Sequence, residues 1–60
     1  MTVQELKEIR KELGMSQMEF AKACGVGRGF ISKVEANVSP MTDKIETIAL
    51  KLVQLKRMME

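Results

Sequence analysis

Four residues near the middle of the chain have the side-chain types and the spacing to bind something outside the protein. They are Arg28, Gly29, Ser32 and Lys33. At about 100° per residue, a helix that buries Ile31 leaves most of this set on its opposite side. The forked guanidinium of Arg28 matches the O6 and N7 acceptors of guanine, Lys33 can bind guanine or a phosphate, and Ser32 can donate or accept a hydrogen bond. These side chains can therefore form hydrogen bonds to the edges of DNA bases.

Two glycines flank Arg28 where this helix is expected to begin. Glycine inside a helix costs about 1 kcal/mol relative to alanine, so Gly27 and Gly29 weaken the helix. Without side chains they let the backbone approach a base edge or a phosphate closely, and Gly29 is therefore included among the candidates for base contact. The alternative for Arg28 is a solvated charge at a frayed helix start.

The segment 16–37 reads as two short helices joined by a tight turn, and these helices must position the candidates. Ser16 is a favourable N-cap, and Glu19 three residues later completes a capping box. Gly25 follows the apolar face of the first helix, at a place where helices commonly end in a left-handed residue. In the second helix, Ile31 and Val34 are expected to point inward.

The amino end of the first of these helices suits a phosphate, because backbone amides and the helix dipole both favour an anion there. The candidates for phosphate contact are Ser16, Gln17, Asn37 and Lys44. Asn37 and Lys44 flank the loop after the second helix. For Gln17 the alternative is an ordinary first-turn residue without a ligand.

The combined spacing resembles that of the phage repressor and Cro proteins, the XRE-type helix-turn-helix family. The resemblance covers roughly residues 3–52 and is carried by Gly14-Met15-Ser16-Gln17, Ala21, Gly25-Val26, Ile31-Ser32 and Glu35-Ala36-Asn37. It implies that the second helix of the motif lies in the major groove of DNA and that the first crosses the backbone. In that family, the glutamine that Gln17 matches contacts the DNA backbone. The family usually has Ser or Thr in place of Gly27 and a longer side chain in place of Gly29.

The resemblance also implies an ion pair between Arg10 and Glu35, which would tie the first helix of the chain to the motif. The alternative is that Arg10 contacts DNA directly. We favour the pair, because losing one partner of a poorly solvated pair strands the other charge.

Composition narrows the classes of function. Sixty residues suggest one domain, 1–60, with a core too small to support a catalytic cleft easily. There is no histidine and only one cysteine, so we expect no catalytic residue, metal site, cofactor or small-molecule substrate. The net charge of +2 is weakly informative, but positions 20–34 hold three cations and no acid. Ordinary solvated cations are the alternative explanation of that stretch.

Cellular location is also an expectation from composition. No apolar run approaches the ~20 residues of a membrane span, and the start lacks a signal-peptide pattern. A single thiol fits a reducing compartment. We expect a cytoplasmic, nucleoid-associated protein of a bacterial or phage-infected cell, with no membrane partner.

Two further helices complete the predicted fold. Thr2 and Glu5 form a capping box before an apolar stripe that Gly14 ends. Thr42 can cap a long C-terminal helix over about 42–59, after the turn at Ser39-Pro40. The sequence predicts an all-α, four-helix, possibly five-helix, repressor-like domain with the motif at 16–37.

The apolar band of the C-terminal helix is longer than three short helices can cover. We expect its second half to form a dimer interface, made of Val53, Leu55, Met58 and Met59. The alternative is a frayed, monomeric C-terminus.

Taken together, the residues predict a sequence-specific regulator of transcription, a repressor that binds a near-palindromic operator in double-stranded DNA as a homodimer. The alternative from another class is a protein-interaction module, such as an antitoxin whose partner docks on the apolar C-terminal helix.

Overall fold

A computed structural model describes all 60 residues and contains four α-helices and no strand. The helices are α1 (Val3–Glu12), α2 (Gln17–Cys24), α3 (Arg28–Glu35) and α4 (Asp43–Met59). This confirms the predicted all-α class with a long C-terminal helix. No fifth helix forms, since α4 continues without interruption to Met59. None of the helices has both the length and the apolar character needed to cross a membrane.

Three of the four helices begin at a side-chain cap that the sequence predicts. The Thr2 and Ser16 hydroxyls accept hydrogen bonds of 3.1 Å from the amides of Glu5 and Glu19, whose carboxylates bond back to the cap amides. Thr42 accepts a bond of 3.3 Å from the amide of Ile45. Helix α3 is the exception: Gly27 is its N-cap and offers no side chain.

The first three helices end by one shared backbone arrangement. A left-handed residue follows each helix, and these residues are Gly14 (φ 70°), Gly25 (φ 72°) and Asn37 (φ 62°). The next amide then bonds back to the carbonyl five residues earlier, as in Met15 to Arg10 (3.2 Å), Val26 to Ala21 (3.0 Å) and Val38 to Lys33 (2.8 Å). Asparagine is the non-glycine residue best suited to this conformation, so Asn37 ends α3 as the glycines end α1 and α2.

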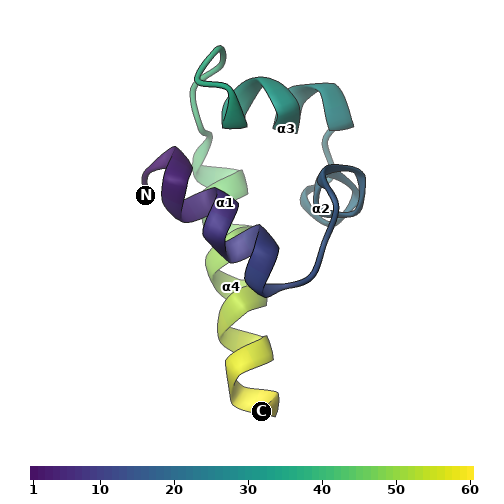
Figure 1. Cartoon of the computed structure of the whole chain (residues 1–60), viewed down its shortest axis with the longest axis vertical. Helices are drawn as coiled ribbons and strands as arrows, with labels where there is room; N and C mark the ends of the chain where they lie inside the picture. The colour runs from purple at the N-terminus through teal and green to yellow at the C-terminus, as the bar shows by residue number, and fades with distance from the viewer.

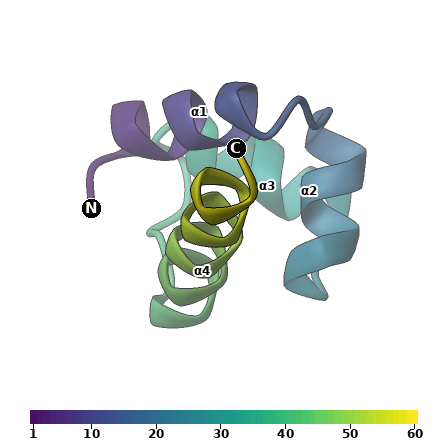
Figure 2. The same cartoon turned by 90° about the horizontal axis from the view of Figure 1, so that it is seen from below.

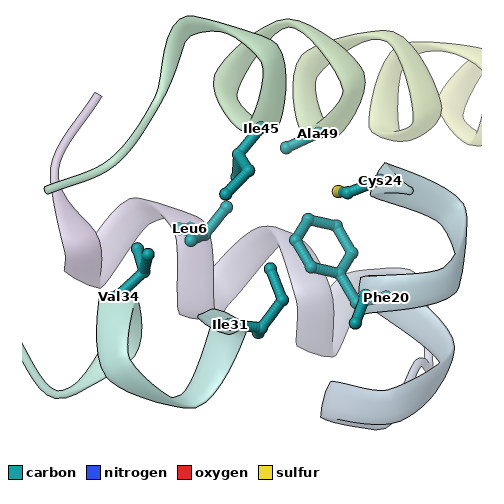
Figure 3. Packing of buried hydrophobic residues seen from close by; sticks show 8 residues of the cluster. Leu6, Phe20, Cys24, Ile31, Val34, Ile45 and Ala49 are labelled. Carbon is teal, nitrogen blue, oxygen red and sulfur yellow. The ribbon is translucent and has the colours of Figure 1, made fainter. Parts of the chain in front are cut away.

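All four helices contribute to one small core (Figure 3). Its fully buried members are Leu6, Phe20, Ala21, Cys24, Ile31, Val34, Ile45 and Ala49. The ring of Phe20 points from α2 into the space between α1, α3 and α4. The inward faces predicted for the two motif helices are therefore the faces that pack.

The helices place α3 and the end of α4 far apart. Helix α3 lies across one end of the long axis of the molecule, and the last turns of α4 form the other end (Figure 1). Helix α3 packs on α1 and α2, which in turn pack on α4. The outer side of α3 and the C-terminal half of α4 are thus two separate surfaces.

Candidate nucleic-acid interface

A buried carboxylate connects the three helices around the motif. The guanidinium of Arg10 on α1 donates to Glu35 on α3 through Nε (2.7 Å) and Nη2 (3.2 Å). Its Nη1 also donates to the carbonyl of Met15 at 3.0 Å, in the connection between α1 and α2. The pairing that the family resemblance implies is thus present in the structure, with Glu35 only 6% exposed.

Gln17 is the third member of this network, and sequence reasoning missed that connection. Its Nε2 donates at 3.1 Å to Oε1 of Glu35, the same oxygen that accepts from Nη2 of Arg10. One N–H of the side-chain amide is thereby used inside the protein, which fixes the direction of the side chain and leaves the other N–H available. Burial on its own would raise the pKa of Glu35, but the hydrogen bonds from Arg10 and Gln17, with the charge of Arg10, hold that pKa below its usual value.

A depression next to this network gathers residues from all three helices. It is lined by Arg10, Ser16, Gln17, Met18 and Arg28. The amino end of α2 therefore borders this shallow site, together with Arg28 and with an Arg10 whose guanidinium is already bonded to Glu35 and to the Met15 carbonyl. Ser16 uses its oxygen as an acceptor for the cap, so its hydroxyl hydrogen is free to donate. The Ser16 hydroxyl and the first amides of α2, at the positive end of the helix dipole, suit a phosphate.

The outer side of α3 carries the predicted base-reading set. Arg28, Gly29, Ser32 and Lys33 are all exposed. Gly27 precedes the helix as its N-cap with extended backbone, so only Gly29 of the two glycines lies inside α3. Our expectation that both glycines fall within the helix is corrected, because the first helical residue is Arg28.

A second depression adds a residue that the sequence did not single out. It lies beside the first, is lined by Lys7, Gln17, Ser32, Glu35 and Ala36, and brings α1 to the edge of the outer face of α3. Lys7 is close enough to Glu35 for its charge to contribute to lowering the pKa of that carboxyl group. No motif could have identified Lys7, because its position depends on how α1 crosses α3.

Two of the residues predicted to contact phosphate also have a role in the fold. Asn37 is exposed and holds the left-handed end of α3. Lys44 lies over the turn after α2: a Cβ atom placed on Gly25 would be 3.3 Å from its Nζ. The ammonium group thus stands at the carboxyl end of α2, where a helix dipole favours a cation.

The residues predicted for a subunit interface separate into two groups. Leu55, Met58 and Met59 are 47%, 75% and 87% exposed. Val53 is instead 3% exposed, because it lies at the seam between α4 and α1. The placement of Val53 at an interface is therefore wrong. The C-terminal turns of α4 meet α1 on one side, where Arg57 pairs with Glu12, and leave Leu55, Met58 and Met59 exposed; Figure 2 views these turns from the C-terminal end of α4.

Short α2 and α3 joined by a left-handed turn, with polar side chains on the outer face of α3, define a helix-turn-helix protein. The helix-turn-helix family model matches residues 6–52, and the chain belongs to this family, the XRE type that the sequence resembles. Neither a curated protein nor a solved structure gave a match. As a member of this family the protein is a DNA-binding regulator of transcription.

Proposed function

We propose that the protein is a repressor that binds a near-palindromic operator as a homodimer, with α3 in the major groove. The observation that carries this proposal is the exposed set on α3 beside a depression at the amino end of α2, lined by Ser16 and Gln17. Side chains on α3 would read base edges while the depression holds a backbone phosphate, which fixes the register of the helix. A repressor of this kind acts by occupying DNA that polymerase needs, so it requires no catalytic group.

Within this surface we assign different roles to its residues. Arg28, Gly29, Ser32 and Lys33 face the bases, while Ser16, Gln17, Asn37 and Lys44 face the sugar-phosphate backbone. The bond from Gln17 to Glu35 supports the role of Gln17, because a side chain that is already fixed loses little entropy on binding.

The dimer would form along an apolar stripe of α4. The stripe consists of Ile48, Leu52, Leu55 and Met59, whose spacing of four, three and four residues is that of a coiled-coil seam. Ile48 and Leu52 are half-buried in the monomer, while Leu55 and Met59 are exposed. A two-fold axis running along α4 would put both α3 helices at the same end of the dimer, where one DNA duplex can meet them (Figure 1).

Selection of bound sites from random DNA tests the proposal. We expect a near-palindromic site with half-site centres about 34 Å apart, and affinity that falls steeply with salt. Recovery of no preferred sequence, together with binding that is insensitive to salt, would refute the proposal.

The exposed end of α4 also favours a second candidate, a protein-interaction module. Leu55, Met58 and Met59 could pack against another protein instead of a second copy. Sedimentation distinguishes the two: the repressor self-associates at micromolar concentration, whereas the module stays monomeric until its partner is added.

Arg28→Ala should weaken binding to the selected operator by about 1–3 kcal/mol and relax preference at one base pair of each half-site. Gln17→Ala should weaken binding to all sequences by a similar factor, because a phosphate contact carries no sequence information. Fluorescence anisotropy on the selected site and its single-base variants measures both effects. If Arg28→Ala keeps every base preference, Arg28 contacts only phosphate, and Ser32, Lys33 or DNA shape must supply the specificity.

Asn37→Gly tests separately the two roles of Asn37, which are to end α3 in a left-handed conformation and to contact a phosphate. Glycine accepts the left-handed backbone more readily than asparagine, so we expect the melting temperature to be unchanged or slightly higher. The loss of a hydrogen bond to phosphate should weaken binding by about 1 kcal/mol, equally for all sequences. Unchanged affinity in this variant would show that Asn37 serves only to end α3.

A further inference from the structure

Gly29 is the one glycine of the chain that lies inside a helix. Gly14 and Gly25 have positive φ, which favours glycine, and Gly27 is an N-cap. Gly29 has no such conformation, and a Cβ atom placed on it would meet nothing within 4 Å. The fold therefore gives no reason for glycine at this position, although alanine is the better helix former.

A contact with a group outside the chain can supply that reason. Gly29 is exposed one turn before Ser32 and directly after Arg28, in the middle of the proposed base-reading set. An amide or hydroxyl side chain here could read a base by hydrogen bonds, and glycine offers only Cα hydrogens and the peptide backbone. The amide of Gly29 lies in the first turn of α3 and has no partner in the helix, whereas its Cα hydrogens can contact an apolar group. The apolar group in the major groove is the C5-methyl of thymine.

We propose that Gly29 is a specificity-determining residue that admits a thymine methyl group against the backbone of α3. This inference rests on the proposed function and adds a recognised base to it. The methyl group would occupy the space that a Cβ atom would fill, in the same half-site as the guanine bound by Arg28. Binding would thus select thymine by fit, without a hydrogen bond from position 29.

The experiment combines Gly29→Ala with removal of single methyl groups from the selected operator. Each thymine is replaced in turn by deoxyuridine, which lacks only the methyl group, and affinities are measured by fluorescence anisotropy. The wild-type protein should lose affinity at one thymine of each half-site. Gly29→Ala should bind the unmodified operator at least about fivefold more weakly and should recover most of that loss when this same methyl group is absent.

Thermal unfolding supplies a readout that does not involve DNA. Gly29→Ala should raise the melting temperature by a few degrees, up to about 8 °C. A lower melting temperature would show that the fold requires the glycine and would overturn the inference. The matched control is Gly27→Ala, which adds the same methyl group at another open position. This variant should regain no affinity when deoxyuridine replaces that thymine.

The outcomes for DNA binding are equally distinct. Unchanged affinity of Gly29→Ala, or a loss that deoxyuridine does not reverse at any position, overturns the assignment of a thymine while leaving the repressor intact. Failure of the wild-type protein to bind any operator refutes the proposed function itself, and this inference with it.

Discussion

Glu35→Ala should lower the free energy of unfolding by about 3 kcal/mol, within the range of about 3–5 kcal/mol for breaking a buried ion pair. The substitution leaves the Arg10 guanidinium, whose side chain is 17% exposed, without its carboxylate. It also removes the acceptor for the Gln17 amide. Denaturant unfolding followed by circular dichroism measures the loss. For a domain of this size such a change is a large share of the total stability.

The chain offers a matched control for this prediction. Arg57 donates to Glu12 through Nε (2.9 Å) and Nη2 (3.1 Å), nearly the geometry of the buried pair, but the Arg57 side chain is 63% exposed. Glu12→Ala should therefore lower the free energy of unfolding far less than Glu35→Ala does, because solvent screens the exposed pair. Equal losses in Glu12→Ala and Glu35→Ala would show that burial of the Arg10 pair contributes nothing.

Acid should reduce the effect of Glu35→Ala. The pKa of Glu35 is lowered in the folded protein. The ionised carboxylate therefore makes its full contribution to stability above the pKa of a free glutamate, which is about 4.3. As the pH falls through the lowered pKa, the carboxylate gains a proton and that contribution is lost. The difference in stability between wild type and variant should therefore shrink below about pH 4.

Leu55→Lys should abolish dimer formation at micromolar concentration and, as a result, reduce affinity for the full operator to that of a single half-site. Each dimer would carry two lysines in an apolar seam, and the lost burial of two leucines corresponds to at least about 100-fold in dissociation constant. Helicity and melting of the monomer should change little, since Leu55 is 47% exposed there. Sedimentation and anisotropy measure the two effects.

Leu50→Lys is the control for Leu55→Lys. Leu50 lies on the same helix and is 48% exposed, but it lines the seam with α1 instead of the proposed stripe. It should leave both self-association and operator binding nearly unchanged. Loss of the dimer in Leu50→Lys but not in Leu55→Lys would move the interface to the seam between α1 and α4.

The sequence predicts those parts of the fold that depend on neighbours along the chain. The capping boxes at Thr2 and Ser16 and the left-handed end at Gly25 follow from residues at most three apart, so their chemistry is visible without knowledge of the packing. The burial of Ile31 and Val34 follows from helical periodicity for the same reason.

Features that depend on how helices cross could not be predicted in this way. The bond from Gln17 to Glu35 and the approach of Lys7 require the placement of α2 and α1 against α3. The error at Val53 has a similar origin. Periodicity identified an apolar face on α4 but not the length of that face covered by α1, and the pair of Glu12 with Arg57 shows that α1 reaches the last turns.

Helix α3 lies across one end of the molecule, and the apolar stripe of α4 extends to the other end (Figure 1). The length of α4 therefore separates the proposed base-reading face from the proposed dimer contact. In the proposed dimer, the angle at which the two α4 helices cross sets the distance between the α3 helices. Changes in the stripe that alter this angle without breaking the dimer, such as Leu55→Ile, should therefore change the preferred spacer length between half-sites. The bases recognised within each half-site should stay the same, so spacing and base preference can evolve separately in this chain.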